Sequence, residues 1–275
     1  MNVHAISIIA ALSLIRCTSA SFPDERQSFV KIRKTLSIKI CKNKRKNKRK
    51  KKVCEEVAEM KSSGSGAAIG KNSVGSFILT AQHVCKDIVE DTRFVSFLEE
   101  VFLSGKKRKN KKLEFSEKMT AIDIEGQTYL LDTINGDEDR DICVMFAENM
   151  QLKPLRRRYT NLAAGEKIYN MAAPLGIFDR DLVPLFDGLY VGERDQYSAM
   201  YSLPATGGSS GSPILDENGR LVGMVHSVIN GFRQIVISPR LEDMNEFLDD
   251  TLNDYYDKWY ANILKMARPK RDTTD

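Results

Sequence analysis

Short apolar runs separated by Gly, Asn and Pro dominate the second half of the chain. Four of these runs, rich in Val, Ile and Tyr, are Lys167–Met171, Gly188–Val191, Leu221–Val225 and Gln234–Ile237. Runs of this length and composition, bounded by turn residues, are typical of strands in a sheet or barrel. The pattern therefore predicts an all-β unit between about residues 160 and 240.

The period of the pattern changes after Pro239. Apolar residues then recur at helical spacing: Leu241, Met244, Phe247, Leu248, Leu252, Tyr255, Tyr256, Trp259, Ile263 and Leu264. This spacing predicts a helix packed on the β unit, extended by a second helix. We assign residues 251–275 to the C-terminal helix and tail.

The first 20 residues read as a secretory signal peptide. Ala5 to Ile15 form an 11-residue apolar run, which is too short to span a bilayer, and Thr18-Ser19-Ala20 offers a cleavage site. We therefore expect a secreted or periplasmic protein in which disulfides are permitted. Cys41 and Cys54 bracket one basic loop and form the natural pair, whereas bonding between Cys85 and Cys143 stays open.

Basic residues cluster in two runs. Residues 42–53 carry nine Lys or Arg in twelve positions, and residues 106–112 carry six in seven. We interpret residues 21–63 as a basic extension and both runs as exposed. Three roles are open for these runs: they increase solubility, they contact a polyanion or a membrane surface, or they are sites of cleavage by another protease. Without interleaved aromatics, sequence-specific nucleic-acid binding is not expected.

Two short motifs carry the candidate chemistry. One motif presents a serine between glycines: Gly208-Ser209-Ser210-Gly211-Ser212-Pro213. The other lies far upstream, where the strand-like run Ser76–Thr80 leads to His83. A serine hydroxyl needs an imidazole as general base, and glycines let backbone N–H groups approach an oxyanion. Of the three histidines, His4 lies in the signal segment, which leaves His83 and His226.

These motifs, with Gly165–Gly176 between them and Asn218–Val225 after them, resemble trypsin-like serine proteases of the chymotrypsin fold, in their HtrA-type branch. The resemblance covers residues 64–250. It implies two six-stranded antiparallel β-barrels, at about 64–150 and 160–240, followed by C-terminal helices. No PDZ domain, which HtrA-type proteins usually carry, is expected here.

The resemblance also implies a mechanism. Ser210 is the nucleophile, His83 is the general base, and the N–H groups of Gly208 and Ser210 form the oxyanion hole. Because the family order is His, Asp, Ser, the orienting aspartate must lie between His83 and Ser210. Asp141 is favoured over Asp139 because the apolar run Ile142–Phe146 follows it. We expect a secreted serine endopeptidase acting on proteins or peptides, with no metal or organic cofactor.

The same resemblance places the first substrate pocket. Its walls map onto Pro204 and onto His226, Ser227 and Val228, where no carboxylate occurs. We therefore expect cleavage after small or medium aliphatic residues.

Two alternatives oppose this interpretation. Gly207–Gly211 also matches the G-x-S-x-G elbow of α/β-hydrolases, with Ser209 as nucleophile. His226 follows Ser209 by only 17 residues, however, which is too little chain for the strands and helices that this fold places between them. The second alternative is a catalytically vestigial protease-like protein that uses its basic loops to bind polyanions.

Overall fold

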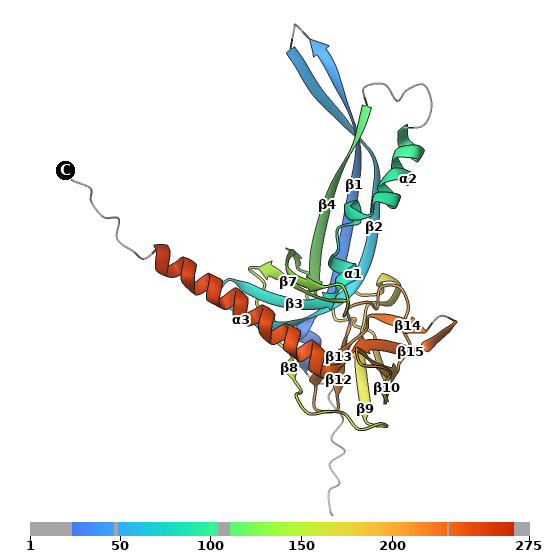
Figure 1. Ribbon diagram of the computed structural model, residues 1–275, viewed down its shortest axis with the longest axis vertical. Helices are drawn as coiled ribbons and strands as arrows, with labels where there is room; N and C mark the ends of the chain where they lie inside the picture. Colours follow the sequence, from blue (N-terminus) through green and yellow to red (C-terminus); the bar gives the residue numbers. More distant parts are fainter. Residues whose placement is uncertain (1–23, 47–48, 104–110, 230, 267–275) are drawn as a thin grey trace, which may run out of the picture.

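The chain folds into two curled β-sheets and one long C-terminal helix (Figure 1). This computed structural model describes residues 24–46, 49–103, 111–229 and 231–266. The predicted all-β class is confirmed. The predicted signal peptide lies outside the described residues, and no helix within those ranges is long and apolar enough to cross a membrane.

The first sheet has seven antiparallel strands in the order β5-β4-β1-β2-β3-β7-β6. Their bounds are β1 Phe29–Lys46, β2 Arg49–Lys71, β3 Gly75–Ala81, β4 Lys111–Asp123, β5 Thr128–Leu130, β6 Asp132–Asp137 and β7 Ile142–Glu148. Three short helices accompany it: η1 Asp24–Ser28, α1 Gln82–Cys85 and η2 Ile88–Glu90. A longer one, α2 Thr92–Leu103, has no counterpart in the sequence-based prediction.

The second sheet has eight strands in the order β14-β15-β11-β10-β9-β12-β13-β8. Their bounds are β8 Arg156–Arg157, β9 Lys167–Met171, β10 Leu185–Glu193, β11 Ser198–Ser202, β12 Pro213–Asp216, β13 Arg220–Met224, β14 Ser227–Ile229 and β15 Phe232–Pro239. All pairs are antiparallel except β13 with β8. The sheets thus hold seven and eight strands instead of the six and six expected.

The expected extension, residues 21–63, does not lie outside the first sheet where the structure describes it, because residues 29–46 and 49–63 are strands of that sheet. Strand β1 lies in the centre of that sheet, between β2 and β4, and Phe29, Val30 and Ile32 are fully buried. Apolar residues alternate along β1, which is the signature of a strand with one buried face. The density of Lys and Arg further along the chain obscured this alternation.

Beyond the core, β1, β2 and β4 continue together as an arm, seen at the top of Figure 1. Helix α2 covers its lower part, where Leu98 packs against Leu36 and Ile38. Further out, the two basic runs meet, because Lys42 of the first run pairs with Lys111 of the second. The described part of the second run is Lys111 and Lys112; residues 106–110 lie outside it.

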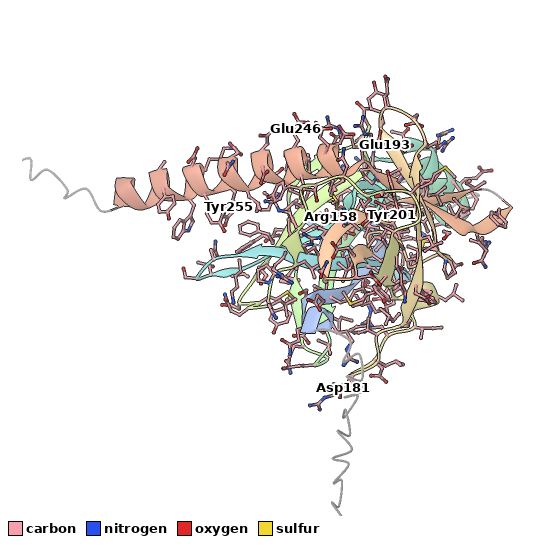
Figure 2. All side chains as sticks on the ribbon, turned by 90° about the horizontal axis from the view of Figure 1, so that it is seen from below. Arg158, Asp181, Glu193, Tyr201, Glu246 and Tyr255 are labelled. Atoms are coloured by element: carbon pink, nitrogen blue, oxygen red, sulfur yellow. A yellow bond between two sulfur atoms is a disulfide. The ribbon has the colours of Figure 1, made fainter. Side chains whose placement is uncertain are left out.

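One hydrophobic core joins both sheets and the C-terminal helix. It brings together Phe77 and Val144 of the first sheet, Leu221 of the second, and Phe247 of the helix α3 Leu241–Met266. The helix is continuous through residue 251, so the predicted division into two helices was wrong. Figure 2 shows Tyr255 projecting from α3, and its ring lies 4.8 Å from that of Phe77.

Candidate active site

His83 and Asp141 are brought together by two neighbouring strands of the first sheet. Strands β3 and β7 pair so that Ala81 lies opposite Ile142, and α1 begins directly after β3. His83 therefore lies next to the residue that precedes β7, which is Asp141. The disulfide between Cys85 and Cys143, left open by the sequence, ties the same two segments together.

Three hydrogen bonds hold the aspartate against this turn. The backbone N–H of His83 donates to Asp141 Oδ1 at 2.8 Å, and His83 Nδ1 lies 2.7 Å from Oδ2. The N–H of Gln82 donates to the Asp141 carbonyl at 3.1 Å. Asp141 has a φ of +52°, in the left-handed region, and these contacts stabilise that conformation.

A second histidine reaches the same carboxylate. His226 Nδ1 lies 3.4 Å from Asp141 Oδ2, the oxygen that also contacts His83. Burial raises the pKa of Asp141, but the hydrogen bonds from His226 and His83 outweigh it and hold the pKa well below its ordinary value. The sequence assigned His226 to the substrate pocket and not to this contact.

The loop around Ser210 depends on two glycines with positive φ. Gly208 has a φ of +93° and Gly211 one of +83°, and a Cβ at either position would collide with backbone oxygen atoms of Ala173 or Ser65. Only glycine fits both requirements. The carbonyl of Ser210 accepts a hydrogen bond from the N–H of Ser65 at 2.8 Å, which docks the loop on β2.

The two adjacent serines differ in accessibility. Ser209 is fully buried, whereas Ser210 is partly exposed and lines a hollow of about 290 Å³ together with His83 and Val84. A buried hydroxyl cannot reach a polypeptide substrate. This difference rules against the α/β-hydrolase alternative, which requires Ser209 as nucleophile.

The peptide groups before Ser210 leave their N–H groups available. The carbonyl of Gly207 accepts from the N–H of Leu175 at 2.6 Å, and the carbonyl of Gly208 accepts from the Ser65 hydroxyl at 2.8 Å. Among the hydrogen bonds of the described residues, none is donated by the N–H of Gly208 or Ser210. Ser65, which sequence reasoning did not single out as a site residue, thus orients this loop; its hydroxyl also accepts from Ala173 N.

Ser210 also lines a second hollow, of about 190 Å³. Residues 205–207 and 225–228 line it, and among them are His226, Ser227 and Val228, which the sequence analysis assigned to the substrate pocket. Pro204 is not part of the lining; Thr206 is. Arg233 also lines this hollow and was missed, because it follows a turn outside the motifs.

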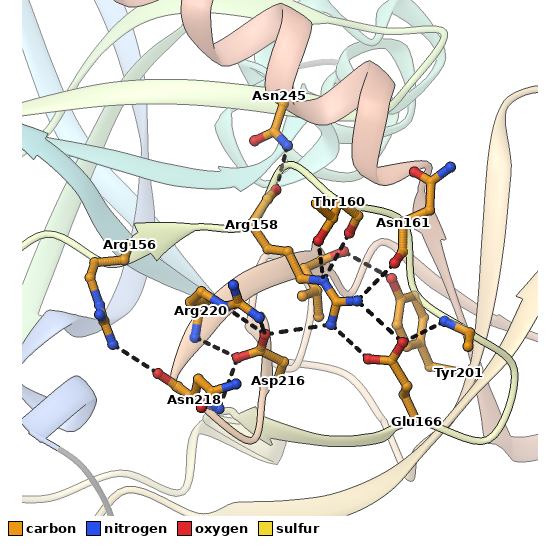
Figure 3. Close-up of polar contacts among 12 residues, drawn as sticks. Arg156, Arg158, Thr160, Asn161, Glu166, Tyr201, Asp216, Asn218, Arg220 and Asn245 are labelled. Atoms are coloured by element: carbon orange, nitrogen blue, oxygen red, sulfur yellow. Dashed lines mark hydrogen bonds and ion pairs between the residues drawn. The ribbon is translucent and has the colours of Figure 1, made fainter.

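A polar network fixes the hairpin behind the nucleophile loop (Figure 3). Asp216, at the end of β12, is buried and pairs with Arg220 at 2.7 Å and with Arg158 at 3.6 Å. Arg158 also pairs with Glu166 at 2.6 Å, and its carbonyl accepts from Asn245 of α3. The network connects β12, β13 and the helix, which holds the loop ending at Pro213 in place.

The predicted disulfide between Cys41 and Cys54 is present, in the arm. Within the described residues these two cysteines and Glu114 are the only group of three potential metal ligands close enough to share an ion. Because both sulfurs are consumed by the disulfide, this group is not a metal site.

The profile of the trypsin-like peptidase domain matches residues 64–224, which is more than half of the chain. The chain belongs to the trypsin-like peptidase family. The match starts within β2, so β1 and the first part of β2 lie outside it, whereas β4 lies inside it. A search of curated proteins finds no match.

Two solved structures resemble this chain. Rv3671c from Mycobacterium tuberculosis, crystallised as a serine-to-alanine mutant in an inactive form, is 13% identical with a TM-score of 0.51, covering 82% of this chain and 87% of that one. A serine endoprotease from Yersinia pestis is 13% identical with a TM-score of 0.53, covering 80% of this chain and 63% of that one. At this identity the likeness shows the shared chymotrypsin-like fold alone.

Proposed function

We propose that the chain is a secreted serine endopeptidase that uses Ser210, His83 and Asp141 to hydrolyse peptide bonds. The observation that carries the proposal is that His83 lies next to both Asp141 and Ser210. Its Nδ1 lies 2.7 Å from the Asp141 carboxylate, and its ring lines the same hollow as the partly exposed Ser210. A nucleophile beside a base that is oriented by a carboxylate is the arrangement that acyl transfer requires.

In the proposed reaction, Nδ1–H of His83 donates to Asp141, which leaves Nε2 to accept the Ser210 proton. The Ser210 oxygen then attacks the peptide carbonyl, and His83 returns the proton to the departing amine. Water hydrolyses the acyl-enzyme by the same route. The N–H groups of Gly208 and Ser210 stabilise the oxyanion of each tetrahedral intermediate.

Covalent labelling tests this proposal. Purified protein is treated with a fluorophosphonate, and the modified residue is located by peptide mass spectrometry. We expect label on Ser210 and none in Ser210→Ala. Ser209→Ala is the matched control, since that serine is buried, and should still be labelled. A folded wild-type protein that takes no label would contradict the proposal and favour the vestigial alternative.

The proposed location rests on the two disulfides and on the apolar run near the N-terminus. Disulfides persist in oxidising compartments, which fits a secreted or periplasmic protein. Sequencing the N-terminus of exported protein tests the signal peptide: we expect the mature chain to begin at Ser21. Retention of residues 1–20 in the exported protein would contradict it.

A second candidate function is polyanion binding by the arm, because β-strand pairing concentrates lysines from both basic runs there. Lys42, Lys52, Lys111 and Lys112 line one hollow of about 430 Å³. We expect salt-sensitive binding to heparin that is lost when these four lysines become glutamine. Binding to anionic lipid vesicles but not to heparin would indicate a membrane surface instead.

A further inference from the structure

The hollow beside Ser210 is lined by an exposed arginine, Arg233. Arg233 is the second residue of β15, and its carbonyl accepts a hydrogen bond from the N–H of Ala205, which fixes its backbone against the hollow. Its guanidinium donates to Thr206 Oγ1 at 3.2 Å. In the part of the chain that the structure describes, Arg233 makes no ion pair, and no carboxylate lines the hollow.

Besides the Ser210 hydroxyl, the remaining side-chain polar groups that line this hollow are two hydroxyls and one imidazole. Thr206 and Ser227 contribute hydroxyl groups, and His226 contributes a ring whose Nδ1 is directed to Asp141. The other walls are apolar, formed by Ala205, Val225 and Val228. A cation, two hydroxyls and an imidazole around a small apolar cavity complement a carboxylate carried on a short aliphatic stem.

We infer that this hollow receives the side chain before the scissile bond and selects an acidic one, Glu or Asp. The inference rests on the proposed function and names the substrate class of that same site. It replaces the expectation of an aliphatic preference. That expectation followed from the lack of a carboxylate at the predicted pocket residues, which did not include Arg233. A Lys or Arg side chain would meet a like charge here without a partner, which is costly.

Cleavage of matched peptides tests the inference. A series is prepared in which the residue before the scissile bond is Glu, Gln, Leu or Lys, and kcat/KM is measured for each. We expect Glu to exceed its neutral isostere Gln by about tenfold or more, the size of a charge-assisted hydrogen bond. Arg233→Gln should abolish the difference between Glu and Gln, and Arg233→Glu should turn the preference toward Lys.

Arg93→Gln is the control, because Arg93 is an exposed arginine on α2, away from this hollow. It should keep the Glu preference unchanged. Equal cleavage of Glu and Gln peptides by wild-type protein, or a Glu preference that survives in Arg233→Gln, would overturn the inference.

A binding measurement separates this inference from the proposed function. Ser210→Ala protein is titrated calorimetrically with product-like peptides that end in Glu or in Gln. We expect tighter binding of the Glu peptide, and loss of that difference when Arg233→Gln is added. If wild-type protein labels with fluorophosphonate but shows neither preference, only the specificity assignment fails. If it does not label, the proposed function fails, and a Glu preference in titration would then mark a peptide-binding site.

Discussion

The two ends of the first sheet use the same strand pairing in opposite ways. At one end β3 is buried along its whole length against the second sheet and α3 and, with β7, positions His83 and Asp141 at its end. At the other end β1, β2 and β4 run past the core and carry exposed lysines. Each end has one disulfide. Strand pairing alone therefore extends the sheet at both ends. Only the end that packs against the second sheet and α3, here called the covered end, holds side chains rigidly enough for catalysis.

The largest expected effect concerns Asp141 at the covered end. Asp141→Asn should lower kcat by about 10⁴-fold, because the amide favours the wrong tautomer of His83. Steady-state kinetics measures the loss, and circular dichroism checks that the fold is intact. The matched control at the edge of the same loop is Asp139→Asn, which should retain activity; equal losses in both variants would contradict the assignment of Asp141.

The disulfides should differ in their effect on stability. Cys85–Cys143 closes a separation of 58 residues within the core, and its removal is expected to cost about 4 kcal/mol. Cys41–Cys54 closes 13 residues in an arm whose end lies outside the core, so its removal should barely change the melting temperature. Differential scanning calorimetry of the two Cys→Ser double variants makes the comparison. A larger drop for Cys41–Cys54 would mean that the arm contributes to the cooperative core.

His226 offers a smaller and sharper test of the covered end. His226→Ala removes one of the two imidazoles on Asp141, so we expect kcat to fall by about tenfold. His226→Gln can still donate a hydrogen bond and should recover part of the loss. An effect on KM alone, with kcat and its pH profile unchanged, would show that His226 acts only as a pocket wall.

The depressed pKa of Asp141 predicts how stability changes with pH. A carboxyl group whose pKa is lower in the folded than in the unfolded state, where it is about 3.9, stabilises the fold above that value and loses this contribution as the pH falls below it. The stability difference between wild type and Asp141→Asn should therefore shrink below about pH 4. Urea unfolding at a series of pH values measures it; a constant difference would contradict the pKa direction.

The smallest expected effect lies at the distal end. Replacing Lys42, Lys52, Lys111 and Lys112 by Gln should change stability by no more than about 0.5 kcal/mol per site, because these side chains are exposed or half-exposed. Lys52 pairs with Glu114 at the surface, where ion pairs contribute little. Thermal unfolding checks this, and a large drop would mean that the arm is packed more firmly than its exposure indicates.

Local sequence patterns determined much of this protein. The glycines around Ser210, the apolar run that leads to His83, the helical spacing after Pro239 and the pairing of Cys41 with Cys54 could all be read directly, because backbone conformation and short-range periodicity depend on neighbouring residues. The same patterns hid β1, since its alternating apolar residues are interspersed with lysines.

Only the tertiary structure decided which residues meet across long separations. Strand register placed Cys85 beside Cys143, and the fold of the second sheet brought His226 to Asp141 and Arg233 to the hollow beside Ser210. It also buried Ser209 and left its neighbour accessible. Register and burial are set by the packing of the whole core, and a single sequence records no distance between residues that are far apart in it.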